Sequence, residues 1–156
     1  MIVKNILTTK AKGTIHMIRE IIKDKTILNT ISKKVNPKST DAKRIIQDLI
    51  DTAKKHADRC VGLAAIQINE PVRIFIVKKD MDVYDVYINP TIIQTYGEKY
   101  ETEEGCMSFD GTKTVTRSKG VILMHQKNNK FIRERFSGFY AEIIQHEMDH
   151  LNGKLI

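Results

Sequence analysis

Two stretches with helical periodicity enclose a middle segment rich in β-branched residues, and this order limits the folds that the chain can adopt. Capping oxygens at positions 39–41 precede apolar residues spaced three and four apart, which predicts a helix from about 40 to 57. A second amphipathic stretch opens after Ser137 and meets Gly153 as a C′ residue, which predicts a helix from about 138 to 152. This order favours the α+β class, with mainly antiparallel β-sheets packed around the C-terminal helix and another helix nearer the N-terminus.

The middle of the chain contains three short apolar runs of the kind that form strands. They extend from Val72 to Val77, from Val83 to Ile88 and from Thr91 to Tyr96. We interpret Asn89-Pro90, which separates the second run from the third, as a turn. Further on, residues 121–124 and 131–136 flank an Asn-Asn pair. Asparagine tolerates the positive φ of a tight turn, so this segment predicts a β-hairpin.

The first 36 residues carry a weaker pattern. Four isoleucines there are spaced so that they could line a short helix, which Pro37 would separate from the next one. These residues are Ile15, Ile18, Ile21 and Ile22.

Length and composition indicate one domain that spans residues 1–156. With 156 residues, 41% of them hydrophobic, the chain can bury one sizeable core. No run approaches the roughly 18 apolar residues that cross a membrane, and the first residues lack the apolar region of a signal peptide. We therefore expect a cytoplasmic protein without a membrane partner, in which Cys60 and Cys106 are free thiols.

The formal net charge of +7 raises the question of a nucleic-acid partner. The lysines are scattered, acidic residues lie between them, and neither a glycine-aromatic RNA-binding signature nor a paired-cysteine finger is present. We expect an ordinary solvated surface and no specific nucleic-acid partner.

The predicted last helix carries the strongest chemical signal, the segment from Gln145 to His150. Residues four apart lie above one another on a helix, so His146 and His150 can direct two ring nitrogens at one cation. Glu147 is rotated away from them, close enough to reach a water at the metal without being a ligand. The alternative is a charged surface helix that contains two histidines by chance.

Cys106 is a candidate third ligand. A thiolate with two imidazoles suits a borderline or soft divalent metal and leaves a fourth position open. A small buried cysteine without a ligand role is the alternative. Gly105, just before it, favours the site because it permits close approach to the backbone.

A third segment, Val61-Gly62-Leu63-Ala64-Ala65-Ile66-Gln67, is small and apolar and ends in a neutral amide. Such a segment lets a peptide lie against the backbone, and the glutamine NH2 can donate to an oxyanion. A packed Gly-Ala turn is the alternative.

The three segments together resemble peptide deformylase. That family is marked, in this order, by GxGxAAxQ, EGCxS and HExxH, and this chain has CVGLAAIQ, EGCMS and HEMDHLNG. The order, the separation of roughly 40 residues between the motifs and the Leu-Asn-Gly ending all agree, over about residues 24 to 156.

This resemblance implies a metal-dependent hydrolase that removes the formyl group from the N-terminal methionine of new polypeptides and releases formate. The metal ligands that it implies are Cys106, His146 and His150. The implied catalytic groups are Glu147 as general base and acid, with the Gln67 side chain and the Met107 backbone N–H as oxyanion donors. The implied substrate contacts are Val61, Gly62 and Gly105 along the peptide backbone, and Phe139 and Ile143 around the methionine side chain.

The cofactor implied by the resemblance is one divalent ion per chain. Ferrous iron (Fe2+) is the usual ion of the family, and zinc, nickel or cobalt can occupy the same ligands. The implied partners are formyl-methionyl nascent peptides, and the ribosome is a further candidate.

Three departures from the family pattern bear on substrate range. Cys60 replaces the first glycine, Ile66 replaces a common proline, and Asp110 stands where a proline is usual. A Cβ at position 60 would narrow the groove, so an inactive or narrowed homologue that binds formylated peptides remains an alternative. A HExxH peptidase that cuts internal bonds is another.

The remaining polar residues near the motifs receive simpler interpretations. Asp149 is expected either to orient a ligand or to be exposed, and Arg117 is expected to be structural. The other three histidines are expected at the surface. They are His16, His56 and His125.

Overall fold

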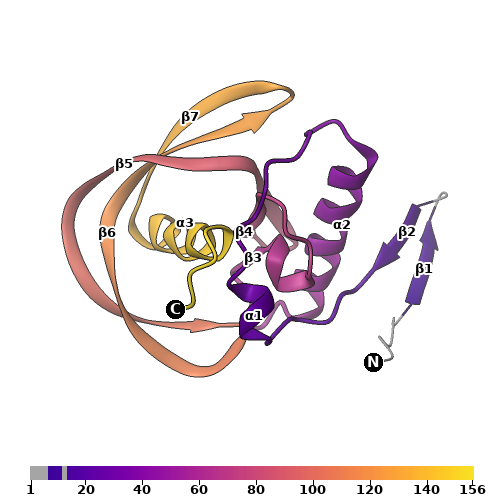
Figure 1. Ribbon diagram of the computed structural model, residues 1–156, viewed down its shortest axis with the longest axis horizontal. Coiled ribbons are helices and arrows are strands. Elements are labelled where there is room, and N and C mark those ends of the chain that lie inside the picture. The colour runs from indigo at the N-terminus through magenta and orange to yellow at the C-terminus, as the bar shows by residue number, and fades with distance from the viewer. Residues whose placement is uncertain (1–6, 12–13) are drawn as a thin grey trace.

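The computed structural model describes residues 7–11 and 14–156 and orders them as a small hairpin, two helices, a sheet and a last helix (Figure 1). The elements before the sheet are β1 (Leu7–Ala11), β2 (Thr14–Met17), α1 (Lys25–Leu28) and α2 (Thr40–Lys55). The others are β3 (Gly62–Ala64), the 3-10 helix η1 (Ala65–Ile68), β4 (Ile74–Asp80), β5 (Val83–Cys106), β6 (Phe109–Lys127), β7 (Lys130–Ser137) and α3 (Gly138–Leu151).

The main sheet is an antiparallel meander with the strand order β3-β4-β5-β6-β7. The long strands β5 and β6 curve around α3, and β1 and β2 pair with each other beyond α2 (Figure 1). This architecture confirms the predicted α+β class and the mainly antiparallel sheet around the C-terminal helix. Among the described residues, no helix is long and apolar enough to cross a membrane.

Strand β4 separates the two halves of the core. Its alternate side chains point to opposite faces, so Phe75 and Val77 pack in the cluster of α3 while Ile74 and Ile76 pack in the cluster of α2. Burial on both faces explains why this strand is an unbroken apolar run rather than an alternating one.

Helix α2 begins and packs as its sequence predicts. The Ser39 hydroxyl accepts a hydrogen bond from the Ala42 backbone N–H at 3.1 Å, which caps the N-terminus. The apolar side is fully buried against β3 and β4 through Ile45 and Leu49, among others. Removing either side chain to alanine typically costs about 2–5 kcal/mol.

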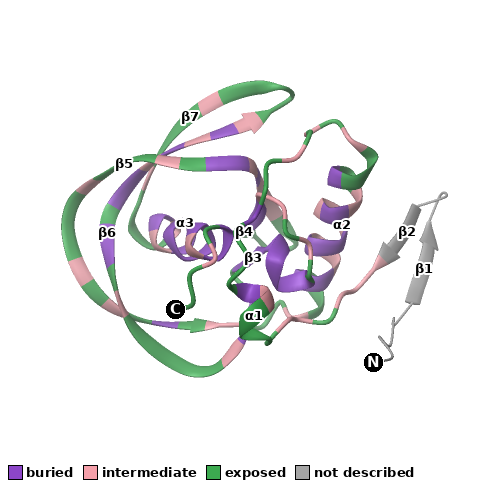
Figure 2. Ribbon diagram, in the orientation of Figure 1, coloured by how far each residue is buried: buried purple, intermediate pink, exposed green. Residues whose placement is uncertain are grey.

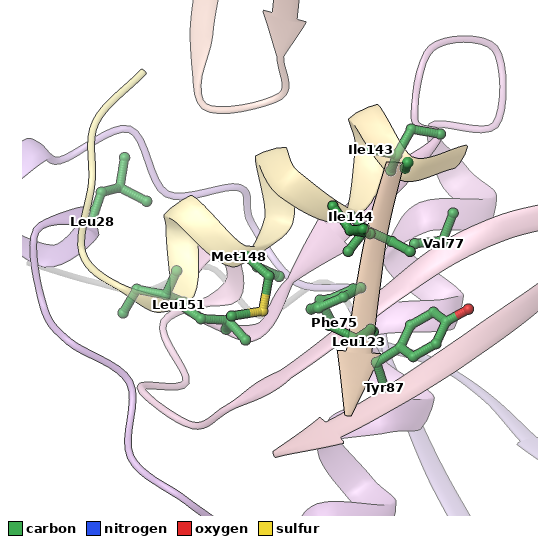
Figure 3. Close-up of a cluster of buried hydrophobic side chains, with 13 residues drawn as sticks. Leu28, Phe75, Val77, Tyr87, Leu123, Ile143, Ile144, Met148 and Leu151 are labelled. Carbon is green, nitrogen blue, oxygen red and sulfur yellow. The ribbon is translucent and has the colours of Figure 1, made fainter. Parts of the chain in front are cut away.

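Helix α3 lies at the centre of the molecule and is mostly buried (Figure 2). Ile144, Met148 and Leu151 form its inward side and pack with Phe75 and Leu123 of the sheet (Figure 3). Nine of its residues are buried, including polar ones. The residues His146, Glu147 and His150 of α3 are therefore fixed in place by packing and are not exposed to solvent.

The C-terminus of α3 is a Schellman motif. The N–H of Gly153 donates to the His150 carbonyl at 3.1 Å, and the N–H of Lys154 donates to the Asp149 carbonyl at 2.9 Å. Gly153 has a φ of 69°, and a Cβ there would lie 2.4 Å from the carbonyl oxygen of Asn29. The predicted helix end is confirmed.

The predicted hairpin near residue 128 is also confirmed. β6 and β7 pair through Lys127 and Lys130, and Asn128 and Asn129 form the turn with φ values of 49° and 65°. Both residues adopt left-handed backbone conformations, as the tight turn requires.

His125 on β6, which we expected at the surface, is instead buried, and its ring packs edge-on to Tyr87. The side chain of His16 lies outside the described residues.

The predicted turn at Asn89-Pro90 is wrong, because β5 continues through it. Asn89 adopts a left-handed φ of 49° within an irregularity of the β5–β6 register. Its amide accepts from the Val35 N–H at 2.9 Å and donates to the Val35 carbonyl at 2.7 Å. The asparagine therefore joins the strand to a distant loop instead of ending it.

The predicted short helix around residues 15–22 is wrong as well. Residues 14–17 form β2, and residues 18–24 belong to no helix or strand. The consecutive side chains of Ile21 and Ile22 pack in the α2 and α3 clusters respectively. Consecutive residues whose side chains point in opposite directions are typical of extended backbone and not of a helix.

Candidate active site

Three potential metal donors converge from two elements. Cys106 ends β5 beside a tight turn into β6, while His146 and His150 stand one turn apart on α3. The Cys106 Sγ lies 3.3 Å from His150 Nε2, and the two Nε2 atoms lie 3.2 Å apart. All three donor atoms fall within 4.8 Å of one another.

The spacing of these donors fits a small divalent cation. Typical tetrahedral zinc bonds are about 2.1 Å to nitrogen and 2.3 Å to sulfur, which separates neighbouring donors by roughly 3.3–3.6 Å. The observed separations of 3.2 and 3.3 Å are close to this range. A thiolate and two imidazoles form a donor set for borderline or soft metals, so the residues present fit such an ion.

Glu104 supports His146 from the side away from this centre. Its Oε2 lies 2.8 Å from His146 Nδ1, and both of its oxygens accept hydrogen bonds from Arg117 at 2.7 Å. Burial alone would raise the pKa of Glu104, but Arg117 and His146 outweigh it and hold the pKa at about 2. The ionised carboxylate therefore accepts the Nδ1–H, which leaves Nε2 of His146 to face Cys106 and His150.

His150 is held neutral by its surroundings. Burial, together with the positive charges of His146 and Arg117, lowers the pKa of His150 to about 3. Its Nδ1 is buried and has no hydrogen-bond partner among the described residues. A neutral imidazole keeps the free lone pair that a metal ligand needs.

Glu147 is buried beside the donors, with 3% of its surface exposed. Its Oε2 has no hydrogen-bond partner within the described part of the chain. Burial raises the pKa of Glu147 to about 7, although the neighbouring His146 acts in the opposite direction. A carboxylate with a pKa near neutrality can both accept and return a proton.

Gly62 lies directly against the side chain of Glu147. A Cβ at this position would lie 2.6 Å from Glu147 Oε1 and 2.8 Å from Ile143 Cγ2. A methyl group here would force the side chains of Glu147 and Ile143 to shift.

The Gln67 amide is oriented by the backbone. Its Oε1 accepts the Ala64 N–H at 3.0 Å, which leaves the NH2 group to face Cys106 Sγ at 3.5 Å and Ser108 Oγ at 3.1 Å. The donor group of Gln67 therefore points at the centre, as an oxyanion donor must.

An open pocket with a volume of about 470 Å³ leads to these groups. Every site residue that we predicted from sequence lines it except His150, which is buried. The predicted residues in the wall are Val61, Gly62, Gln67, Gly105, Cys106, Met107, Phe139, Ile143, His146 and Glu147. Phe139 and Val61 are exposed at 65% and 42%, and Ile143 is buried.

Of the three departures from the family pattern, two are buried in the core and one lines the pocket. Cys60 does not line the pocket but is buried in the α2 cluster, where its S–H donates to the Gly62 carbonyl at 3.3 Å. Ile66 is buried in the α3 cluster. Asp110 does line the pocket, and its side chain is almost fully exposed.

Sequence reasoning missed the support behind the ligands. Glu104 belongs to the quoted EGCMS motif, which was the available signal, yet we gave it no role; the structure buries it at 7% exposure, where an acid needs partners. Within the described part of the chain, no hydrogen bond joins the Asp149 carboxylate to either ligand histidine; it accepts one from Arg117 at 2.7 Å instead. Residues of the pocket that we did not single out are Arg59, Glu103, Phe109, Gly111 and Glu142.

The chain matches one family along most of its length. The sequence profile of a family described as Polypeptide deformylase matches residues 18–156. A peptide deformylase of Clostridium beijerinckii is 36% identical over 141 residues, which are 90% of this chain and 100% of that protein.

Solved structures agree with this match. A peptide deformylase from Thermotoga maritima has a TM-score of 0.81 and 31% identity, covering 90% of this chain and 95% of that one. A class I type b peptide deformylase from Acinetobacter baumannii, with Met-Ala-Ser bound, has a TM-score of 0.80 and 28% identity, covering 90% and 96%.

Proposed function

Because the chain belongs to the polypeptide deformylase family, we propose that residues 1–156 form one domain whose site removes the N-formyl group from the initiator methionine of nascent polypeptides. The products are formate and a free N-terminus. The observation that carries this proposal is the convergence of Cys106, His146 and His150, with Glu147 buried beside them in a peptide-sized pocket.

The metal would be held by Cys106 Sγ and by the Nε2 atoms of His146 and His150. A divalent cation in that position supplies Lewis acidity that makes water nucleophilic at neutral pH. We propose ferrous iron (Fe2+) as the native ion, with zinc, nickel or cobalt as substitutes, because the donor set accepts all of them.

Glu147 is the proton carrier of the reaction. It takes a proton from the water that attacks the formyl carbon, and it returns this proton to the amine nitrogen as the C–N bond breaks. Burial supports both steps because it brings the pKa of this carboxyl to about 7. Groups in this role typically contribute 10²–10⁴-fold to the rate, roughly.

Two donors stabilise the negative charge that develops on the formyl oxygen. They are the NH2 of Gln67, which faces the centre, and the backbone N–H of Met107, which follows Cys106 in the pocket wall. The Gln67 donor acts more strongly here than in water because its side chain is buried, at 1% exposure.

The substrate would lie between β3 and the end of β5. Val61, Gly62 and Gly105 line the two sides and offer backbone groups to the peptide, while Phe139 and Ile143 offer apolar surface to the methionine side chain. Met-Ala-Ser, bound in the Acinetobacter baumannii structure, begins with the same residue. The proposal further includes a cytoplasmic location and formyl-methionyl nascent chains as partners, with the ribosome as a partner to be tested.

Formate release from formyl-Met-Ala-Ser tests the function. The wild-type protein should release formate, and Glu147→Gln should lower the rate at least about a hundredfold with the metal retained. Glu98→Gln, which changes an exposed carboxylate on β5, is the control and should match wild type. Equal rates in wild type and Glu147→Gln would reject the assigned role.

The same assay separates the rival functions. Hydrolysis of casein without formate release would identify an internal peptidase. Binding of the formylated tripeptide without turnover by the metal-loaded wild type would identify an inactive homologue.

A further inference from the structure

We propose that Asp149 is a positioning residue for His146, and that it acts through Arg117 and Glu104 rather than on either histidine directly. The inference rests on the proposed function, because it concerns the same metal centre. The structural basis is a continuous line of four alternating acidic and basic side chains that ends at a predicted metal ligand.

The line is made of short contacts, and three of its four side chains are buried. Asp149 Oδ2 accepts from Arg117 Nη1 at 2.7 Å, and the Nε and Nη2 of Arg117 donate to the two oxygens of Glu104 at 2.7 Å each. Glu104 Oε2 then accepts from His146 Nδ1 at 2.8 Å. The side chains of Arg117 and Glu104 are only 7% and 6% exposed, so these contacts are poorly screened.

The guanidinium of Arg117 is pinned by two carboxylates on different elements. Glu104 lies on β5 and takes one edge of the plane with both oxygens, while Asp149 lies on α3 and takes the remaining nitrogen. A planar fork held at both edges has one orientation. That orientation directs Glu104 Oε2 at the imidazole of His146.

Among the described residues, the second ion pair of Asp149 is weaker than its contact with Arg117. Its other oxygen lies 3.7 Å from Lys154 Nζ, and that lysine side chain is 70% exposed, so the contact is weak. Arg117 and Asp149 also border a second pocket of about 280 Å³. Without the Asp149 carboxylate, Arg117 has room on this side to turn away from Glu104.

The first test measures metal affinity rather than turnover. Asp149→Ala should weaken binding of Co2+ by about three- to tenfold in a chelator competition, less than the 10–100-fold typical of losing the partner directly behind a ligand, which here is Glu104. The absorption spectrum of the Co2+ protein should shift as the His146 ring reorients. Asp149→Asn, which keeps the shape of the side chain, should show a smaller change of the same sign.

The matched control is Asp48→Ala on α2. Asp48 is likewise a helical carboxylate that binds arginines, at 2.7 Å from Arg19 and 3.2 Å from Arg44, but it does not line the metal pocket. This variant should lose thermal stability while Co2+ affinity and spectrum stay as in wild type. A change limited to stability in Asp149→Ala, as in this control, would overturn the proposal.

A double-mutant cycle tests the route. If Asp149 acts through Glu104, then Asp149→Ala should change Co2+ affinity less than twofold in a Glu104→Gln background, where the line is already broken. Effects that multiply independently in the double variant would also overturn the proposal.

Failure of this inference is distinguishable from failure of the function. Absence of formate release by metal-loaded wild type would reject the function. Normal release by wild type, with unchanged Co2+ affinity in Asp149→Ala, would reject only the positioning role.

Discussion

Glu104 and His146 are 42 residues apart, yet the carboxylate Oε2 of one lies 2.8 Å from the ring Nδ1 of the other. Because Glu104 is ionised under ordinary conditions, the ring nitrogen that faces it must carry the hydrogen. The opposite nitrogen of His146 is thereby left to the cluster with His150 and Cys106. A strand acid thus determines which atom of a helix residue can bind a cation.

Removal of the metal should lower both activity and stability. A cation held by Cys106, His146 and His150 binds the folded state only, and an ion at 100 times its Kd adds about 2.7 kcal/mol of stability. Chelation should lower Tm by several degrees and abolish formate release, and anaerobic addition of Fe2+, or of Co2+, should restore both. An unchanged Tm and full activity after verified metal loss would contradict a metal centre at these residues.

Replacement of Gln67 by leucine should lower kcat by roughly 10²–10³-fold, the usual effect of deleting one oxyanion donor. Leucine keeps most of the side-chain volume but removes the NH2 group that faces Cys106 and Ser108. The measurement is formate release at saturating substrate, with metal content determined in parallel. Gln94→Leu, at an exposed position on β5, is the control. A loss confined to KM would show that Gln67 contributes to binding alone.

Gly62→Ala should destabilise the protein, whereas Gly105→Ala should not. The new Cβ at position 62 would clash with Glu147 and Ile143, and such overpacking typically costs about 1–3 kcal/mol. At position 105 the nearest atom is the Gly111 carbonyl oxygen at 3.8 Å, an ordinary contact. Urea unfolding of both variants gives the comparison, and equal free energies of unfolding would mean that α3 yields to the added methyl group.

Cys60 should resist thiol reagents in the folded protein. Burial, followed by the charge of Glu147, raises the pKa of the Cys60 thiol from 9.0 to about 12, and the thiolate is the reactive form. In metal-free protein, Cys106 should therefore react with a disulfide reagent first, and Cys60 only after unfolding. The variants Cys60→Ser and Cys106→Ser assign the two phases, and rapid loss of both thiols in folded protein would rule out this burial.

The raised pKa of Cys60 should make the free energy of unfolding fall at high pH. The folded pKa lies above the unfolded one, so this contribution is complete below pH 9 and is lost as the pH rises towards 12, by about 1 kcal/mol per pH unit. The free energy of unfolding of Cys60→Ala should decline less steeply over this window than that of wild type. If the free energies of unfolding of the two proteins declined equally with pH, the Cys60 thiol would not contribute to this pH dependence.

Several elements were predictable because their signals are local. The cap at Ser39, the turn asparagines 128 and 129, and the C′ Gly153 each act within a few residues of the structure they specify. The continuation of β5 through Asn89 was not predictable, because the partner of that amide, Val35, is 54 residues away. A local turn signal was outweighed by a distant backbone segment.

The site divides in the same way. The ligands and the buried acid follow from motif spacing on one helix and one strand end. The link from Glu104 through Arg117 to Asp149 follows instead from how β5, β6 and α3 pack, and no spacing in the sequence specifies that packing. Packing also explains why Cys60 does not narrow the pocket, since its side chain lies in the α2 cluster.

The order of strands in the sheet is the order in which they occur in the chain. Assembly can therefore proceed hairpin by hairpin, with each strand adding to its immediate predecessor and little entropy lost in closing long loops. Helix α3 follows all of these strands and carries two of the three donors, so the donor set is complete only after it docks. Metal uptake would then report that folding has finished, and a chain halted at the meander could neither retain the ion nor act on a peptide.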